Sequence, residues 1–583
     1  MVSKKRIAVI NYDKCNPQRC GGYLCENVCP VNRTGKECIV HEEGKKPVIS
    51  EELCIGCSIC ENKCPFGAIS IVNINFELDD PIHSFGQNLF RLHGLPLPKE
   101  KSVVGLIGRN GIGKSTAIKI LSGESVPNFG AEKESRERVL EYYKGKEALA
   151  FFEGLYSDPS VAVKPQNVEV IKARGKVREL LKKVDEGGRL EDVAEELSIS
   201  ALLDREADSL SGGEFQKVAI AATGLKKAKL YFFDEPTSFL DIRERLRVAR
   251  FIRKLTEKAS VIVVEHDLIL LDYLSDYVHL MYGKPGVFGF VSQVKTTREG
   301  INTYLEGYSK DENYRFREYP INFFEHEGVE KKELGENIVK WPALEKKLGE
   351  FSLGAEENAV RRNEVIGILG PNGIGKTTFM KMLAGELEPD NTKLDAGVRV
   401  SYKPQYISYT GNKTVKELFD SKGFERVKKE LLRPLEIGPL LEKKASNLSG
   451  GELQRVSVAL CLSREADIYL MDEPSAYLDV EQRLNVGKVI KNQMDLKDCS
   501  AIIIDHDLTF IDYLSDKLMV FLGEPAVRGK AEGPFTKEEG INRLLGYLEI
   551  TVRRDKDSKR PRINKPDSVL DRKQKKKGDY YYT

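Results

Sequence analysis

The chain has 583 residues, 41% of them hydrophobic and 31% charged, and a net charge of +2. This length exceeds what a single hydrophobic core serves and predicts about three or four domains. The sequence has no apolar run of the roughly 18 residues that a membrane span needs, and its N-terminal apolar stretch is too short for a secretory signal. We therefore expect a monomeric, cytoplasmic protein without a membrane partner.

Nine of the eleven cysteines lie between Cys15 and Cys64, and such clustering in a cytosolic protein indicates metal ligands rather than disulfides. The second run, Cys-x2-Cys-x2-Cys-x3-Cys-Pro, has the bacterial ferredoxin spacing, in which the fourth cysteine ligates the neighbouring cluster. Two zinc sites are the alternative, although zinc needs neither the third close cysteine nor the trailing x3-Cys-Pro. Residues 1–75 are thus predicted to form a ferredoxin-like domain with two [4Fe–4S] clusters. The expected ligands are Cys29, Cys54, Cys57 and Cys60 for one cluster, and Cys15, Cys20, Cys25 and Cys64 for the other.

Cys38 is left over by this assignment, and it could replace Cys15 or Cys20 as a ligand.

Two phosphate-binding loops follow, as part of an internal duplication. GRNGIGKS over Gly108–Ser115 recurs as GPNGIGKT over Gly370–Thr377, and each loop lies between an apolar strand-like run and a helix-like run, as a P-loop requires. The later motifs KPQ, LSGGE, DEP and HD repeat at an offset of 238–240 residues (166 to 405, 234 to 472, 266 to 506). The chain therefore carries two related nucleotide-binding modules.

Each motif has a chemical role. The glycines let backbone N–H groups approach phosphates, the lysine reaches the β- and γ-phosphates, and the Ser or Thr hydroxyl ligates Mg²⁺. Apolar runs deliver Asp234 and Asp472 to the metal, and the glutamate that follows each is placed to polarise the attacking water. The histidines end apolar runs close to the γ-phosphate position. The predicted catalytic residues are Glu235, Glu473, His266 and His506.

The combination of these motifs resembles the ABC ATPases, with LSGGE as the diagnostic part. A helix that begins at this motif presents N–H groups to a phosphate. In ABC proteins it completes the site across an interface, so the resemblance implies that the modules face head to tail and that ATP joins them until hydrolysis. Site one would combine Lys114, Gln166, Glu235 and His266 with Ser449 and Gly451; site two would combine Lys376, Gln405, Glu473 and His506 with Ser211 and Gly213.

The further residues expected at the two sites follow from the same motifs. The remaining ATP-binding positions are Gly108, Asn110, Gly111, Gly113, Ser115 and Thr116 in the first loop, and Gly370, Asn372, Gly373, Gly375, Thr377 and Thr378 in the second. The expected Mg²⁺ ligands are Ser115, Gln166 and Asp234 in site one, and Thr377, Gln405 and Asp472 in site two.

The fold class is therefore α/β, with tandem ABC modules at 76–308 and 319–546, a linker at 309–318 and a basic tail at 547–583. The spacing from the P-loop lysine to the glutamine is 52 residues in the first module (114 to 166) and 29 in the second (376 to 405). The extra residues, 131–158, are predicted to form a helix–turn–helix that docks a partner, with a plain surface hairpin as the alternative. Its apolar seam would comprise Val139, Leu140, Tyr143, Leu149, Phe152 and Leu155.

The tail carries twelve Lys or Arg against four Asp between Arg553 and Lys577. With the polar, aromatic linker it is predicted to form a composite hinge whose arginines contact a phosphate backbone. The alternative is a solvated, disordered tail.

The iron–sulfur domain, the twin modules, the insertion and the RRD…RPRINKP segment together resemble the E class of ABC ATPases, the ribosome-recycling factor also called RNase L inhibitor. The resemblance covers essentially the whole chain. It implies a protein that splits ribosomes after termination or rescue with a release factor or its stalled-ribosome relative, remains on the small subunit and is linked to initiation factors. It also implies that the iron–sulfur domain is a rigid lever, and that the insertion and hinges contact ribosomal RNA.

Two details follow from this resemblance. Phe85 and Phe90 fall where the family stacks adenine. Asp505 precedes His506 where the first module has Glu265, a difference that permits functional asymmetry between the sites.

Two other classes of function stay open. A redox enzyme would use ATP hydrolysis to gate electron delivery from the clusters, but the sequence supplies no flavin or substrate-reduction motif. A soluble ABC ATPase that clamps nucleic acid would bind free DNA or RNA tightly, which the near-zero net charge disfavours.

Overall fold

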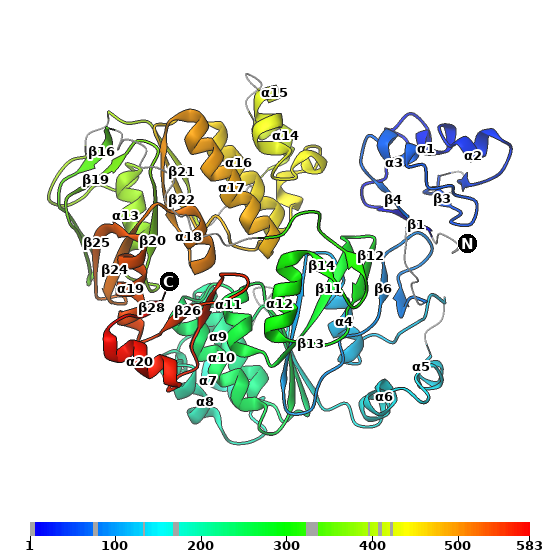
Figure 1. The fold of residues 1–583 in the computed structure, drawn as a ribbon, viewed down its shortest axis with the longest axis horizontal. Helices are drawn as coiled ribbons and strands as arrows, with labels where there is room; N and C mark the ends of the chain where they lie inside the picture. The colour runs from blue at the N-terminus through cyan, green and yellow to red at the C-terminus, as the bar shows by residue number, and fades with distance from the viewer. Residues whose placement is uncertain are drawn as a thin grey trace.

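A computed structural model of the chain describes residues 6–42, 44–73, 80–131, 135–166, 174–321, 336–394, 397–405, 411–419 and 424–582. Figure 1 shows a small N-terminal domain, two α/β modules and a C-terminal segment that packs against both modules. Across these ranges, no helix combines the length and apolar character needed to cross a membrane.

The N-terminal domain is built on one antiparallel pair, β1 (Arg6–Ile10) with β4 (Ile69–Asn73). Because strand side chains alternate between two faces, Ala8 and Ile71 point into the cysteine-lined core, whereas Ile7 and Val9 pack on the first module. The short elements between the two strands are α1 (Leu24–Asn27), α2 (Pro30–Arg33), β2 (Ile39–Val40), β3 (Val48–Ile49) and α3 (Ile59–Lys63).

The first module is a sheet covered by helices, in the order β5-β6-β12-β11-β7-β10-β9-β8, with β13 beside β11. Its central strand β7 is buried along its whole length, as expected for a parallel strand covered on both faces. The elements are β5 (His83–Ser84), β6 (Arg91–His93), β7 (Val103–Gly108), α4 (Lys114–Leu121), α5 (Arg136–Tyr142), α6 (Ala148–Ser157), β8 (Val161–Lys164), α7 (Val177–Lys182), α8 (Leu190–Glu196), α9 (Gly212–Leu225), β9 (Leu230–Asp234), α10 (Ile242–Leu255), β10 (Ser260–Val264), α11 (Leu268–Leu274), β11 (Tyr277–Lys284), β12 (Phe288–Val291), β13 (Lys295–Thr296) and α12 (Thr297–Glu306).

The second module repeats this sheet, in the order β17-β18-β25-β24-β20-β23-β22-β21. The predicted α/β duplication is thereby confirmed, and both P-loops follow the equivalent strands β7 and β20. The elements are β16 (Asn337–Trp341), β17 (Leu344–Leu348), β18 (Phe351–Ala355), β19 (Asn358–Arg361), β20 (Val365–Leu369), α13 (Lys376–Leu383), β21 (Val400–Lys403), α14 (Val415–Leu418), α15 (Phe424–Val427), α16 (Gly450–Ser463), β22 (Ile468–Asp472), α17 (Val480–Lys497), β23 (Ser500–Ile504), α18 (Leu508–Leu514), β24 (Lys517–Glu524), β25 (Arg528–Thr536) and α19 (Lys537–Leu548).

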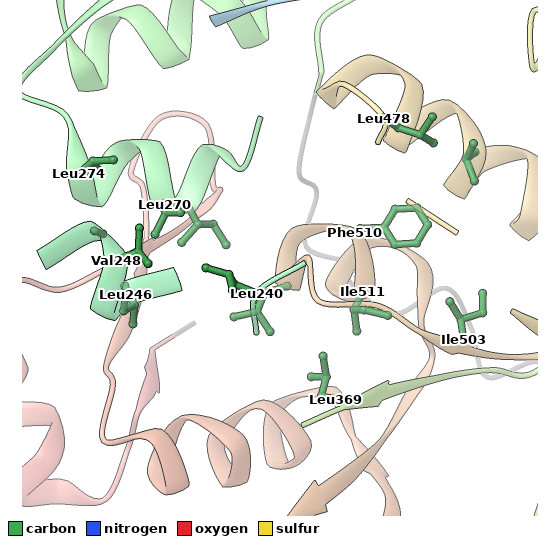
Figure 2. Close-up of a cluster of buried hydrophobic side chains, with 14 of the residues drawn as sticks. Leu240, Leu246, Val248, Leu270, Leu274, Leu369, Leu478, Ile503, Phe510 and Ile511 are labelled. Atoms are coloured by element: carbon green, nitrogen blue, oxygen red, sulfur yellow. The ribbon is translucent and has the colours of Figure 1, made fainter. Parts of the chain in front are cut away.

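One buried apolar cluster extends through both modules (Figure 2). It contains Leu240 and Leu270 of the first module together with Leu369 and Ile511 of the second. The modules are therefore held together by continuous hydrophobic packing as well as by polar contacts.

The insertion forms the two helices α5 and α6, which Figure 1 shows at the edge of the first module. Val139 and Phe152 of its apolar seam are fully buried in that module's own core. The seam therefore anchors the insertion, and only its polar side is left for a partner.

The linker forms a short hairpin, β14 (Tyr308–Ser309) with β15 (Tyr314–Arg315). The tail is a folded unit with the elements β26 (Val552–Arg554), β27 (Pro561–Ile563), α20 (Val569–Lys577) and β28 (Tyr581–Tyr582).

The tail arginines, which the sequence interpretation assigned to phosphate contacts, bond carboxylates of the protein itself. Arg560 and Arg562 contact Asp272 of α11 at 3.2 and 2.6 Å, and Arg554 contacts Asp512 of α18 at 3.3 Å. The tail therefore joins the two modules through ion pairs, because α11 and α18 belong to different modules.

We predict that Asp272→Asn lowers the thermal unfolding midpoint by several degrees. The side chains of Asp272 and Arg560 are 3% and 2% exposed, so the substitution leaves a buried guanidinium without its counter-charge. Removal of one partner of a buried pair costs about 3–5 kcal/mol. Differential scanning calorimetry measures the shift.

Asp512→Asn is the matched control at the equivalent position of the second module. Its pair with Arg554 is more exposed, at 16% and 12%, so a smaller loss is expected. Equal losses for the two variants would show that burial of the Asp272 pair contributes nothing extra.

Candidate functional site

Each P-loop joins a central strand to a helix through a glycine with left-handed backbone. Gly113 precedes α4 with φ of 100°, and a Cβ there would lie 2.8 Å from the Phe90 ring, so only glycine fits. Lys114 Nζ donates to the carbonyls of Gly108 and Arg109 at 2.8 and 2.9 Å. The second loop repeats this with Gly375, Lys376, Gly370 and Pro371.

A hydroxyl and a carboxylate oxygen lie together beside each loop. Ser115 Oγ is 3.5 Å from Asp234 Oδ2, and Thr377 Oγ1 donates to Asp472 Oδ2 at 2.6 Å. Burial and the neighbouring Glu235 charge raise the pKa of Asp234 to about 6. Oxygen ligands of this kind suit Mg²⁺, whose charge would offset the cost of burying the carboxylate.

Glu235 is held at one oxygen by two side chains. Gln166 Nε2 donates to Glu235 Oε1 at 2.6 Å, and His266 Nε2 lies 3.4 Å from the same oxygen. Burial opposes the charge, but His266, Lys114 and Gln166 outweigh it and lower the pKa of Glu235 to about 2. The carboxylate is thus ionised and able to accept a hydrogen bond from water. The second module repeats the arrangement with Glu473, Gln405 and His506.

Site one is assembled from both modules, as the ABC resemblance implies. One pocket is lined by the first P-loop, Phe85 and Phe90 on one side and by Ser449 and Gly451 of α16 on the other. Other predicted residues on its wall are Asn110, Gly111, Gly113, Lys114, Ser115, Thr116, Gln166, Asp234 and Glu235.

Site two is held together by contacts of Asn372. Its side chain donates to the Phe239 carbonyl at 3.2 Å, and a Cβ at Gly213 would lie 3.0 Å from that oxygen. The second P-loop therefore lies next to the start of α9, whose N-cap is Ser211. Gly373 and Thr378 take the same places in this loop and α13 as Gly111 and Thr116 do in the first.

Two carboxylates that the sequence interpretation did not assign bridge the modules. Asp479 Oδ2 accepts from the Asn110 amide at 3.0 Å, and Asp241 Oδ2 accepts from the Asn372 amide at 2.9 Å. Burial opposes ionisation, but backbone hydrogen bonds lower the pKa of both aspartates. They occupy matching places in the repeat, after SFL and AYL, so alignment of the two halves was the signal that could have identified them.

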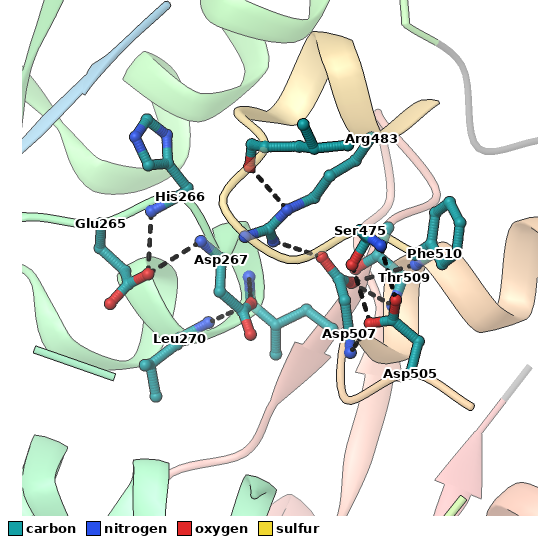
Figure 3. A network of polar contacts seen from close by, with 12 residues as sticks. Glu265, His266, Asp267, Leu270, Ser475, Arg483, Asp505, Asp507, Thr509 and Phe510 are labelled. Carbon is teal, nitrogen blue, oxygen red and sulfur yellow. Dashed lines mark hydrogen bonds and ion pairs between the residues drawn. The ribbon is translucent and has the colours of Figure 1, made fainter. Parts of the chain in front are cut away.

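The difference between Glu265 and Asp505 leaves the surrounding hydrogen bonds unchanged (Figure 3). Glu265 accepts from Thr237 Oγ1 at 2.6 Å and from the Asp267 amide, whereas Asp505 accepts from Ser475 Oγ at 2.8 Å and from the Asp507 amide. The two acids therefore hold the histidine segments in the same way.

A different feature makes the sites unequal. Arg109 of the first P-loop lies 3.4 Å from Glu436 and 3.5 Å from Glu481, both in the second module. Pro371 and Arg243 occupy the places equivalent to Arg109 and Glu481, so these ion pairs are specific to site one.

The cysteines of the N-terminal domain gather in two groups. Cys29, Cys54, Cys57 and Cys60 line one pocket, the set that the crossover pattern predicts. Cys15 lies within electrostatic range of Cys20 and Cys64, and Cys25 within range of Cys15 and Cys20. Burial raises the pKa of Cys60 to about 12 and that of Cys25 to about 11, so bound iron would be needed to keep these thiolates ionised. The donor set fits iron–sulfur clusters.

Cys38 lies beside Cys29 and Cys54 and lines the first pocket. This position makes it a poor substitute for Cys15 or Cys20, which belong to the other group.

The N-terminal domain is fastened to the rim of site one. Lys284, which lines that pocket, contacts Glu61 at 2.8 Å, and the Gly286 amide donates to the Gly111 carbonyl at 2.9 Å. The Asn88 side chain, fully buried, donates to the carbonyls of Ala8 and Ile49 at 2.9 Å. A short chain of contacts therefore joins the first P-loop to the cysteine domain.

The fold and the composite sites define a twin-module ABC ATPase with a cysteine-rich N-terminal domain. The family model described as ABC transporter matches residues 98–238 and 357–476. The models for a possible Fer4-like domain in RNase L inhibitor and a 4Fe–4S binding domain match 6–37 and 47–70. The N-terminal domain is thus a 4Fe–4S-binding domain, rather than a pair of zinc sites.

Relatives match over almost the whole chain. An uncharacterized ABC transporter ATP-binding protein of Methanocaldococcus jannaschii is 49% identical over 99% of this chain and 97% of its own. ABC transporter E family member 1 of Arabidopsis thaliana is 44% identical over 99% and 98%. The protein therefore belongs to the E family of ABC ATPases, which confirms the resemblance seen in the sequence, and it is an ATPase.

Solved structures agree with this assignment. A model of ribosome-bound archaeal Pelota and ABCE1 superimposes with a TM-score of 0.95 at 53% identity, covering 100% of both chains. The crystal structure of archaeal ribosomal stalk protein aP1 with the archaeal ribosome recycling factor aABCE1 gives 0.81 at 51% identity, covering 86% of this chain and 99% of the other.

We predict that Cys54→Ala lowers the iron content by about half, because one of the two expected clusters loses a ligand. Iron analysis and the visible absorbance of anaerobically purified protein measure the loss.

Cys38→Ala is the matched control, since it removes a second buried thiol from the same pocket. It is expected to retain all its iron. Iron loss in Cys38→Ala alone would exchange the roles of the two cysteines.

Proposed function

We propose that the protein splits ribosomes into subunits after termination or rescue, together with a release-factor-type protein, and then remains on the small subunit. Support comes from the full-length likeness to an ABCE1 that is ribosome-bound with Pelota and from the likeness to an archaeal ribosome recycling factor. The observation on this chain that carries the proposal is the chain of contacts between the first P-loop and the cysteine domain. It gives nucleotide-driven motion a direct route to that domain.

The two composite sites would bind and hydrolyse ATP. The P-loop amides and the start of the opposite signature helix would hold the phosphates, and Phe85 and Phe90 would face the adenine. Ser115 with Asp234, and Thr377 with Asp472, would hold Mg²⁺, which neutralises phosphate charge when bound. Glu235 and Glu473 would each accept a hydrogen bond from the attacking water, and His266 and His506 would orient the glutamates.

ATP binding would keep the modules closed, because each site contains parts of both. Closure would move the cysteine domain through the contacts of Lys284 and of Val287 and Phe288 with β1. Two [4Fe–4S] clusters, one per cysteine group, would stiffen this domain, whose own core is small. A stiff domain transmits force to a bound factor, whereas a flexible one would dissipate it.

The ribosomal surface would be contacted by the exposed cations of the tail helix and by the polar side of the insertion. Arg572, Lys573, Lys576 and Lys577 are exposed on α20, unlike the arginines that bond Asp272 and Asp512. These side chains are suited to phosphate contacts with small-subunit RNA. Initiation factors would then meet the protein on that subunit.

We predict that the double variant Glu235→Gln, Glu473→Gln hydrolyses ATP on the order of 10²–10⁴-fold more slowly, because both water-polarising carboxylates are lost. Affinity for ATP is expected to remain, since the P-loops are untouched. Phosphate release and titration with a fluorescent nucleotide measure the two quantities.

The single variants are controls for each other. If either one hydrolyses ATP at the wild-type rate while the other is inactive, only one site turns over. Wild-type rates in the double variant would exclude the glutamates as general bases.

We predict that the wild-type protein, with a release factor and ATP, converts joined ribosomes to subunits on an anaerobic sucrose gradient. Cys54→Ala is expected to fail, because a softened domain cannot push, while Glu473→Gln is expected to stay bound to the small subunit.

The ATPase rate without ribosomes separates these effects, since Cys54→Ala should retain it. Ribosomes that stay joined with the active wild-type protein, without co-migration with either subunit, would exclude recycling, and a redox titration would then test the alternative.

A further inference from the structure

Two lysines are buried beneath the catalytic centres, one in each module. Lys164 ends β8 and Lys403 ends β21, and their exposed fractions are 0% and 2%. Both belong to the KPQ motif, two residues before the glutamine. Lysine is almost never fully buried unless its ammonium group has partners, so these partners identify its role.

The partners are the backbone carbonyls of the metal-binding aspartate and of the glutamate after it. Lys164 Nζ donates to the Asp234 carbonyl at 2.9 Å and to the Glu235 carbonyl at 3.2 Å. Lys403 Nζ donates to the Asp472 carbonyl at 2.7 Å and to the Glu473 carbonyl at 3.5 Å. The contact is short because β8 and β21 pair in parallel with β9 and β22, one register step before each aspartate.

These carbonyls belong to a backbone that side-chain-bearing residues rarely adopt. Glu235 has φ of 47° and Glu473 has φ of 48°, in the left-handed region. Gln216 also donates to the Glu235 carbonyl at 2.7 Å, and Gln454 takes the same place in the second module. The lysine and the glutamine thus hold this carbonyl from two elements, and the conformation persists because its surroundings over-determine it.

The orientation of the carboxylate depends on this backbone. With φ positive, the Glu235 side chain lies toward Gln166 and His266, where it makes its hydrogen bonds. If the peptide relaxed toward an ordinary conformation, the carboxylate would leave this position while the P-loop stayed in place.

We infer that Lys164 and Lys403 are positioning residues that fix the backbone of the catalytic glutamates and so set the rate of hydrolysis without binding nucleotide. The inference rests on the roles of Glu235 and Glu473 proposed above. It is independent of the ribosomal target.

The duplication supplies an internal control for the test. Lys403→Met removes the donor but keeps an unbranched side chain, and it is made in the Glu235→Gln background, where only site two can turn over. We expect kcat to fall by about 10- to 100-fold there, the effect of a misplacement of roughly 1 Å, with KM for ATP unchanged.

The same substitution in the Glu473→Gln background, where only site one can turn over, is expected to change nothing. Site one needs Ser449 and Gly451 of the second module, so general damage to that module would lower its rate as well. Equal losses in both backgrounds, or a raised KM with unchanged kcat, would overturn the inference. Lys164→Met in the exchanged backgrounds repeats the test.

Hydrogen exchange gives a readout that does not require turnover. In Lys403→Met, or in the more conservative Lys403→Gln if Met prevents folding, exchange should rise across residues 472–475 and stay unchanged across 234–237. No rise at 472–475 would overturn the inference. If Glu473→Gln itself leaves hydrolysis intact, the assignment of the catalytic glutamate fails instead.

Discussion

The structure depends on a hydrogen bond that crosses between modules, from a P-loop amide to an aspartate of the opposite half. Asp241 uses one oxygen to cap its own helix, accepting from the Glu244 amide at 3.0 Å, and the other to accept from the Asn372 amide at 2.9 Å. Asp479 does the same with Gln482 and Asn110. Because one carboxylate serves both, separation of the modules leaves buried polar groups unpaired at both a helix N-terminus and a P-loop. Opening at a nucleotide site is therefore felt in both halves.

The cysteine domain follows from the same geometry. Its strand β1 has one face toward the cysteines and the other toward Val287 and Phe288, so the domain cannot shift on the first module without exposing apolar surface. The adjoining residues Lys284 and Gly286 contact Glu61 and the P-loop. The domain is thus attached at the place where nucleotide acts, which suits a mechanical role better than electron delivery to a distant acceptor.

Duplication kept the chemistry of the two sites alike while their interfaces diverged. The pair Glu265 and Thr237 became Asp505 and Ser475 with the same hydrogen bonds, so the histidine segments match. Arg109, by contrast, forms ion pairs across site one that have no counterpart at Pro371. Any inequality between the sites therefore arises from what holds the modules together rather than from the hydrolytic groups.

The sequence by itself determined the fold class, both P-loops, the water-polarising glutamates and the two cysteine groups. Each of these is a short motif, in which covalent spacing places the reacting atoms within one loop or turn. Alignment of the two halves would also have found Asp241 and Asp479, since they repeat at the same offset.

Only the tertiary structure decided which charged side chains act within the protein. Lys164 reaches Asp234 across neighbouring strands, and Arg560 finds Asp272 almost three hundred positions earlier in the chain. Nothing in the local pattern distinguishes such a lysine or arginine from a solvated one. The distinction is made by burial, because a charge removed from water must find a partner, and the fold alone brings that partner near.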